Sequence, residues 1–436
     1  MTFILIFKVR YSRRDFKGNR AFFSFMLVFF LLLALKPAVW GLEGEENSDF
    51  QVAQVNKTII RGIHLLYDEQ FDEAENLFLI VINESPQKPD GYFYMAMVSW
   101  SRLASGFWSP ETVGEFRERI DRTIHVARNR IEGTNKPDSY DYFFLGGALG
   151  FKGRFELMRG KWLTSFFLAR DAIKALRTCL EMDPDNKDVM LGLGTFDYYT
   201  AHLSGVLKFL TYLLLHKGNK EEGLRKLHLA AQKATYSATE AKSMLLHIYL
   251  FLEEDFSKAL DLAEGLSKRY DMNPRYHTIK GVCYIRLGRV IRYRDIVYGL
   301  RQRALQASSL NAASQWRRRA HYLETVYDLY HGRYPEARSK LQEILRRADT
   351  ENDPAMIAFP LVKMGMSYDL EGDREEAEKY YRRVMDMVWR ARLWVCPIGD
   401  LHCWSFIALL KFQISNPKYQ TNSNDQNSKI QTMSCP

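Results

Sequence analysis

Apolar residues recur at steps of three and four along much of the chain, and a small residue recurs at a fixed place among them. In residues 332–345, GRYPEARSKLQEIL, this spacing joins Tyr334, Ala337, Leu341 and Ile344. Steps of three and four put these side chains on one face of a helix, and Ala lets a neighbouring helix approach closely. The pattern therefore predicts an amphipathic helix packed tightly against another helix.

The same spacing is found in five other segments, at 71–86, 169–184, 219–230, 256–266 and 371–385. We interpret each segment as the second helix of a helical hairpin, because the small residue marks a point where a partner helix comes close. In chain order, these small residues are Ala74, Ala172, Gly223, Ala259, Ala337 and Ala377.

The predicted first helices have their own signature, in which a Gly stands beside large apolar residues. It occurs in YFFLGGAL around Gly146, in MLGLG around Gly194 and in LVKMGMSY around Gly365. This is again an apolar helix face with one point of close approach. With both signatures, residues 51–390 resemble the tetratricopeptide repeat (TPR) family, whose unit is a helical hairpin of about 34 residues.

The resemblance implies an all-α fold, an α-solenoid in which about eight irregular TPR-like hairpins stack into a right-handed superhelix with a concave groove. The intervals between the small residues are uneven, so we expect divergent hairpins in the two widest gaps. One should place its second helix after Ser109 as N-cap and Pro110 in the first turn. The other should cover residues 274–305.

The resemblance also implies where a ligand would bind, because groove-facing residues in this family come from the first helix of each hairpin. Carried over to this chain, the predicted groove residues are Ile59, Ile63, Tyr140, Phe143, Asp188, Thr195, Tyr198, Val362 and Met366. The set is mostly aromatic and aliphatic. We therefore expect an amphipathic helix or an apolar peptide as ligand, and not an acidic C-terminal peptide. The alternative is that half of these side chains are simply buried by adjacent insertions.

Three segments after the first repeats depart from the repeat pattern. Residues 194–223 form a long apolar insertion, which is either a helix buried between hairpins or a lipid-facing or partner-facing element. Residues 391–414 predict a helix that caps the last hairpin. Residues 415–436 lack apolar content and predict a disordered polar tail.

Residues 1–41 have the layout of a targeting segment. A basic region ends at Arg20, the uncharged run 21–35 follows, and Lys36-Pro37 ends that run. We predict a cleaved signal peptide or an N-terminal membrane anchor, and hence an exported protein that is periplasmic or envelope-associated. Initiation of translation at Met26 would remove most of this signal.

The formal net charge of +9 comes mostly from that N-terminus. Residues 1–41 contain seven Lys or Arg and one acid, so the remainder carries only +3. This distribution argues against a nucleic-acid-binding protein. An Arg-rich stretch at 286–303, followed by Arg317–Arg319, is usually a solvated helix face. Its other interpretation is a patch for an acidic partner, anionic lipid or nucleic acid.

Catalytic and metal-binding motifs are missing from the sequence, so we expect no enzyme activity and no cofactor. Asp197 stands among aromatic residues and is the most enzyme-like position, which keeps an α-helical hydrolase as a third hypothesis. We expect Cys179 and Cys283 to be buried free thiols. Cys396 and Cys403 allow a disulfide in an oxidising compartment.

The sequence therefore predicts a non-enzymatic protein-binding scaffold or adaptor of the cell envelope, with a partner peptide or helix in the groove. The alternative is an envelope assembly or transport factor that handles lipid or glycan. Membrane association would come through residues 21–35, and a nucleic-acid partner is not expected. The identity of the partner and the oligomeric state stay open.

Overall fold

The computed structural model describes residues 54–105, 109–134, 136–159, 161–202, 218–347 and 355–390. The chain divides into two compact units, Met1–Lys57 and Thr58–Pro436. In the first unit the described residues are 54–57, which are helical. The described part of the second unit consists of helices and their connecting turns and contains no strand, which confirms the predicted all-α class.

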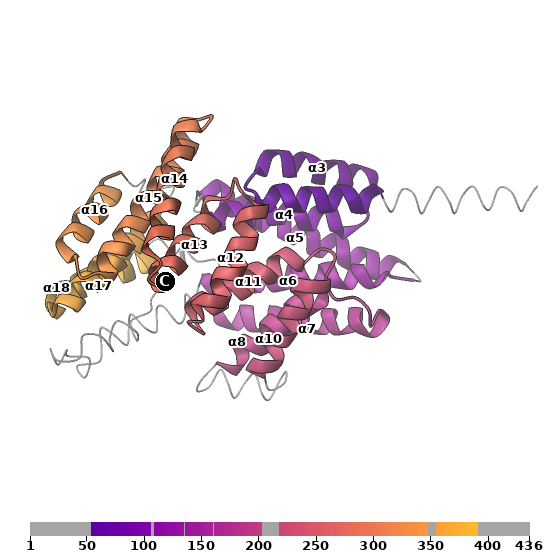
Figure 1. Ribbon diagram of the computed structural model, residues 1–436. Coiled ribbons are helices and arrows are strands. Elements are labelled where there is room, and N and C mark those ends of the chain that lie inside the picture. The colour runs from indigo at the N-terminus through magenta and orange to yellow at the C-terminus, as the bar shows by residue number, and fades with distance from the viewer. Residues whose placement is uncertain are drawn as a thin grey trace, which may run out of the picture. The chain divides into compact units, whose positions relative to one another are not determined.

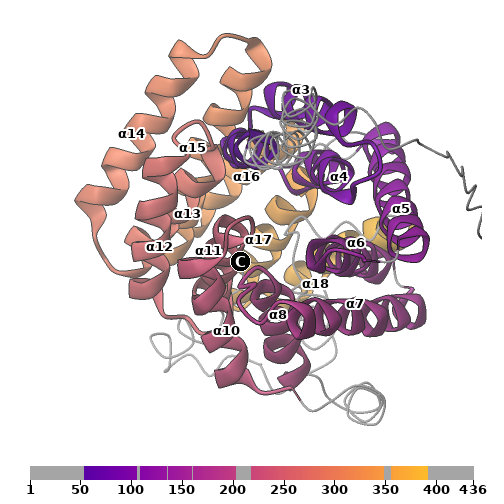
Figure 2. The ribbon, with the colours of Figure 1, turned by 90° about the vertical axis from the view of Figure 1, so that its right-hand side faces the viewer.

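The second unit begins with a helix over residues 58–67, termed the first helix below. The helices that follow are α3 (Phe71–Glu84), α4 (Pro89–Ala104), α5 (Pro110–Gly133), α6 (Ser139–Met158), α7 (Trp162–Met182), α8 (Val189–Ala201), α10 (Lys220–Lys233), α11 (Ala238–Phe251), α12 (Phe256–Arg269), α13 (Pro274–Arg286), α14 (Val290–Gln306), α15 (Leu310–Tyr330), α16 (Tyr334–Arg347), α17 (Ala355–Glu371) and α18 (Arg374–Arg390). From α3 onward, each of these helices packs against the next one in the chain (Figures 1 and 2).

Within the described ranges the helices pair into eight hairpins, from the first helix with α3 to α17 with α18, so the expected helical repeat is confirmed. Both divergent hairpins are present. α5 begins after Ser109, whose hydroxyl accepts a hydrogen bond from the backbone N–H of Thr112 at 3.1 Å, and Pro110 occupies the first turn as expected. α13 and α14 form the hairpin predicted at 274–305.

The small residues lie where two helices touch. Ala74, Ala259, Ala337 and Ala377 are fully buried on their helices. At Gly223 of α10, an added Cβ would come within 2.6 Å of the backbone nitrogen of Tyr198 on α8. Any larger side chain would therefore push these two helices apart, which explains the fixed place of Ala or Gly in the sequence pattern.

In five of the eight described hairpins, the turn between the two helices contains a residue with positive φ at the same place. Gly288, Gly332 and Gly372 have φ values of +68°, +71° and +91°, and each stands two residues before the second helix of its hairpin. Glu69 and Glu254 hold the same place with φ values of 59° and 51°. A residue in the left-handed region ends the first helix and reverses the chain, as in the common helix C-terminal motifs.

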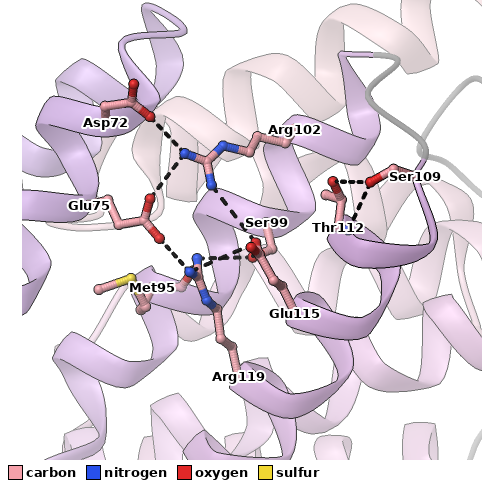
Figure 3. A network of polar contacts seen from close by, with 9 residues as sticks. All are labelled: Asp72, Glu75, Met95, Ser99, Arg102, Ser109, Thr112, Glu115 and Arg119. Atoms are coloured by element: carbon pink, nitrogen blue, oxygen red, sulfur yellow. Dashed lines mark hydrogen bonds and ion pairs between the residues drawn. The ribbon is translucent and has the colours of Figure 1, made fainter. Parts of the chain in front are cut away.

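An ion-pair network ties the first two hairpins together (Figure 3). Glu75 on α3 accepts from Arg102 on α4 at 3.0 Å and from Arg119 on α5 at 2.5 Å. Arg119 also donates to the fully buried hydroxyl of Ser99 at 3.1 Å. Glu115 of α5 lies 3.9 Å from Arg102 and 3.8 Å from Arg119, and Asp72 of α3 pairs with Arg102 at 2.8 Å. Charges on three helices are thereby paired at the edge of the core.

Several sequence predictions lie outside the described residues. These are the targeting segment 1–41 with its apolar run 21–35, the capping helix 391–414, the tail 415–436, and residues 203–217 of the insertion. Among the described helices, none has the length and apolar character needed to cross a membrane. The flanks of the insertion, α8 and α10, pack directly on each other.

The two described cysteines match their prediction. Cys179 and Cys283 are both buried and free, and burial raises the pKa of each thiol to about 12. Such thiols stay protonated at neutral pH and act as small apolar side chains. Cys396 and Cys403 lie outside the described residues.

Candidate functional site

The first helix packs against elements that follow it by more than 170 residues. Tyr67 donates its phenol hydrogen to Glu240 of α11 at 2.6 Å, and its backbone carbonyl accepts from the Asn273 side chain at 2.8 Å. The His64 imidazole lies 3.0 Å from the Tyr270 hydroxyl. We name this set of bonds the closing contact. It means that the side of α11 and α13 facing the first helix is already occupied by the chain itself.

The protonation state of His64 follows from its partners. Arg269 donates to the Nε2 atom of His64 at 2.7 Å, so the Nδ1 atom must carry the imidazole proton and donate it to Tyr270. Burial, and then the positive charge of Arg269, lower the pKa of His64 from its ordinary value. The closing contact is therefore built around a neutral histidine.

A cavity of about 50 Å³ lies beside the closing contact. The charged or ionisable side chains in its lining include Glu69, Arg154, Glu240, His247 and Arg275. Glu69 accepts from the Ser105 hydroxyl at 2.8 Å, and Arg154 lies over the Trp100 ring at 5.0 Å. The space suits a few water molecules and not a peptide. Burial raises the pKa of Glu69, as expected for a carboxylate in a small enclosed site.

Most of the predicted groove residues have little surface for a partner. Seven of the nine are buried: Ile59, Ile63, Phe143, Asp188, Tyr198, Val362 and Met366. Tyr140 and Thr195 are half-buried. In this structure, a ligand in the predicted groove would therefore touch these two side chains and the backbone around them. Whether the groove binds a partner stays a prediction.

The structure brings three of the groove residues into one cluster. The Tyr140 and Phe143 rings lie 5.8 Å apart, and the Tyr140 hydroxyl donates to Asp188 at 3.3 Å. Asp188 also accepts from the backbone N–H groups of Tyr236 at 2.8 Å and Ser237 at 2.7 Å. Asp188 thus fixes the segment before α11 and has a structural role.

The remaining groove residues lie elsewhere. Tyr198 donates to Glu253 at 2.5 Å within the central core, and Val362 and Met366 belong to the core of the last two hairpins. Ile59 and Ile63 are buried on the first helix. Apart from the cluster around Asp188, the buried groove residues thus belong to the packing of their own hairpins.

Asp197 is held in a structural ion pair. Its carboxylate lies 2.5 Å from the Nζ atom of Lys226 on α10, and only 5% of the aspartate side chain is exposed. Lys226 also approaches Glu222 at 3.5 Å. This arrangement locks α8 to α10 and leaves little of the carboxylate for a substrate. Among the described residues there is also no group of three His, Cys, Asp or Glu side chains able to hold a metal ion.

The most exposed apolar side chains within the described ranges are on α14 and at the start of α15. Ile291, Tyr298 and Leu305 are 77%, 66% and 80% exposed and stand seven residues apart, so they form one stripe along the helix. We name it the α14 stripe. The opposite face of α14 is buried through Tyr293, Val297, Leu300 and Ala304. α14 is therefore apolar on two faces, and no element among the described residues covers one of them.

A pocket of about 370 Å³ adjoins the end of the α14 stripe, between α14, α15 and α16. Its apolar lining consists of Ala304, Leu305, Ala320 and Ile344, and its charged lining consists of Arg301, Arg317, Arg318, Arg347, His321 and Glu343. We name it the α14–α16 pocket. Part of the Arg-rich stretch noted in the sequence is thus gathered around an apolar floor.

The sequence indicated the basic residues of this region, but we did not predict from it the exposed apolar stripe on α14. The signal was available, because Ile291, Tyr298 and Leu305 share a spacing of seven within an Arg-rich helix. It was obscured because the buried face of the same helix uses the usual steps of three and four.

Comparison with known proteins gives a repeat family and several similar folds. Residues 361–387, which include most of α17 and the first part of α18, match the tetratricopeptide repeat family. No curated protein matches the chain in sequence. One similar solved structure is a human IFIT1 dimer with PPP-AAAA, at 13% identity and a TM-score of 0.36, covering 74% of this chain and 69% of that chain.

Two further solved structures are similar. The P58(IPK) TPR domain has 13% identity and a TM-score of 0.21, with 87% of this chain and 96% of that chain covered. Naa15/Naa10 bound to HypK-THB has 12% identity and a TM-score of 0.24, with 81% of this chain and 69% of that chain covered. At these identities the likeness concerns the fold alone.

Proposed function

This chain is a divergent tetratricopeptide repeat protein, and from that premise we propose that it is a non-enzymatic scaffold that binds another protein. The observation that supports the proposal is the α14 stripe. A single exposed apolar residue is ordinary on a protein surface, but three large ones along one helix face are typical of an interaction site.

The dimensions of the stripe suit a helical partner. Ile291 and Leu305 are separated by four helical turns, which corresponds to about 21 Å along the axis. A partner helix with apolar residues at matching steps would cover the stripe and remove its three side chains from water. The exposure of its three side chains leaves the stripe open to a partner, and Figure 2 shows α14 at the edge of the drawn helices.

The groove predicted from the sequence is a second candidate surface of the same scaffold. Its accessible part is Tyr140 and Thr195. Replacement of Phe143 or Tyr198 by Ala would remove a buried aromatic side chain and lower the stability of the fold, so it would not measure binding alone. Tyr140→Phe is the cleaner probe of the groove.

We also propose that the scaffold works at the cell envelope. The support is the sequence of residues 1–41, where a basic region precedes an apolar run. The expected result is that the intact chain is recovered with the membrane or periplasmic fraction, while a variant that starts at residue 42 stays in the cytoplasm. Equal distribution of both chains would reject the envelope location.

The scaffold itself is tested by partner capture followed by binding of the purified partner. The variant carries Ile291→Ser and Tyr298→Ser, and its control carries Leu79→Ser and Ile80→Ser on α3, where the side chains are 46% and 45% exposed. We expect one defined protein to bind the unmodified chain and the control, with affinity lowered at least about tenfold by the α14 changes. Equal affinity for all three chains, or binding of lipid or glycan in place of a protein, would reject the proposal.

A further inference from the structure

We propose that the α14–α16 pocket receives an apolar side chain of an acidic amphipathic segment in the partner protein, whose carboxylates pair with Arg301, Arg317 and Arg347. This inference rests on the proposed scaffold function and adds the chemical character of the partner. It concerns a place formed by the second helices of two successive hairpins, α14 and α16, and by α15 between them.

The floor of the pocket calls for an apolar group. Ala304, Ala320 and Ile344 are nearly fully buried, whereas Leu305 is 80% exposed and forms a wall. A volume of about 370 Å³ has room for a large aliphatic or aromatic side chain. Filling it would cover Leu305 and continue the apolar contact that begins at Ile291.

The charges around the pocket are unevenly paired. Arg301 pairs with Glu324 at 2.5 Å, and Arg347 pairs with Glu343 at 2.8 Å. Arg317 donates to the neutral carbonyl oxygen of Ala313 at 3.3 Å. The exposed side-chain fractions of Arg301 and Arg347 are 58% and 75%, so both can reach a second carboxylate. Arg301, Arg317 and Arg347 face two acids, and this excess of positive charge favours a negatively charged partner.

The same charges argue against a second copy of this chain as the occupant. α14 exposes Arg292, Arg294 and Arg301 beside its stripe, with Asp295 as the exposed acid on that stretch. Pairing two copies through this helix would place arginines against arginines, which is unfavourable at close range.

The test is a fluorescence anisotropy titration of the full-length chain with a labelled helical peptide. The probe is a 15-residue peptide with Leu along one helical face and Glu elsewhere, and its matched peptide carries Lys in place of every Glu. We expect the Glu peptide to bind and the Lys peptide to fail. Raising the salt concentration should weaken the Glu peptide, because exposed charges are screened.

Two pairs of variants locate the binding site. Arg347→Glu should weaken the Glu peptide by about tenfold or more, while Arg346→Glu, next to it on α16 and outside the pocket lining, should change it less than about threefold. Leu305→Ser should weaken binding in the same way, while Leu310→Ser, which removes an 86% exposed side chain outside the lining, should not. Thermal unfolding of all four variants checks that the fold is intact.

The inference is overturned if the Glu and Lys peptides bind alike, or if each pocket variant behaves like its control. Co-sedimentation with phosphatidylglycerol vesicles provides a separate outcome: vesicle binding lost in Arg347→Glu without any peptide binding would assign the pocket to membranes and reject it as a peptide site. A partner protein whose binding is weakened by Ile291→Ser and Tyr298→Ser but unchanged by Arg347→Glu would support the scaffold function and reject the pocket as its binding site.

Discussion

The imidazole of His64 hydrogen-bonds the hydroxyl of Tyr270 at 3.0 Å, although 206 positions separate the two residues. In most arrays of helical hairpins each repeat contacts only its neighbours. Here the start of the second unit is bonded to the segment between α12 and α13, and Met272 extends the contact by donating its backbone N–H to Asp68 at 2.9 Å. The closing contact therefore makes distant hairpins depend on each other.

The closing contact should weaken in acid. The pKa of His64 is lowered in the folded state, so the folded chain binds the proton less well than the unfolded chain. The stabilisation is complete above the ordinary pKa of 6.5 and is lost as the pH falls below it toward the folded value. We expect the free energy of unfolding, measured in urea, to fall between pH 7.5 and pH 5, and His64→Gln to show a shallower slope.

Two other histidines also contribute to the dependence of stability on pH, and their contribution must be separated from that of His64. Burial also lowers the pKa of His228 and of His277, so both add to the slope in the same direction. His228→Gln serves as the matched control, because His228 bonds Tyr249 within neighbouring hairpins and not across the closing contact. The second readout is the protection factor of the first helix in hydrogen exchange. If this factor is equally insensitive to pH in the unmodified chain and in His64→Gln, the closing contact is not the titrating element.

Two substitutions at turn residues with positive φ should change the stability of the protein in opposite directions. Glu254→Gly should stabilise the protein by about 1 kcal/mol, because glycine adopts a positive φ without the steric cost that Glu bears. Gly332→Ala should destabilise it by about 1 kcal/mol for the same reason. Both changes are measured by thermal unfolding. The loss of the Arg286–Glu254 pair at 3.9 Å should matter little, since both groups are partly exposed.

Substitution of two helical glycines by Ala should separate the effect of close helix packing on stability from the effect of helix propensity. At Gly365 an added Cβ would come within 2.7 Å of a ring carbon of Tyr381, so Gly365→Ala should cost about 2 kcal/mol. At Gly265, in the middle of α12, an added Cβ meets no atom within 4 Å. Gly265→Ala should therefore stabilise the helix by about 1 kcal/mol. Destabilisation by both changes in urea unfolding would contradict this account.

The ion-pair network of the first hairpins should contribute measurably to stability. Glu75→Gln keeps the size of the side chain but removes the charge that faces Arg102 and Arg119. We expect a loss of about 1 kcal/mol, reduced from the value for a buried pair because roughly a fifth of each side chain is exposed. Glu73→Gln, an exposed neighbour on α3, should change the free energy of unfolding by less than about 0.5 kcal/mol. Equal effects of both substitutions would show that the pairing is not stabilising.

The architecture could be predicted because its determinants are local. Ala337 and Gly223 follow the helical spacing of their own segments, and Ser109 caps the helix it immediately precedes. Such features depend on residues within one or two turns, so a sequence pattern records them directly. The Gly332 turn is equally local, since its positive φ is required by the chain reversal beside it.

The candidate site could not be predicted in the same way. Phe143 and Tyr198 stand at groove positions of their hairpins, but both are buried, and periodicity does not say which element covers an apolar face. Ile291 and Leu305 present the opposite case, because apolar residues on a helix are assigned to a core unless the partner face is known to be missing. In both cases the exposure of an apolar face depends on non-local packing, which a sequence pattern does not record.

The closing contact also sets an order of events while the protein is being made. The first helix leaves the ribosome before its partners, because Tyr270 is 206 positions behind His64. At ~5–20 residues per second, roughly 10–40 s pass before those partners are synthesised. Until then, Tyr67 and the other polar groups of that helix are hydrated or bound by a chaperone, because their hydrogen-bond partners in the middle of the array do not yet exist.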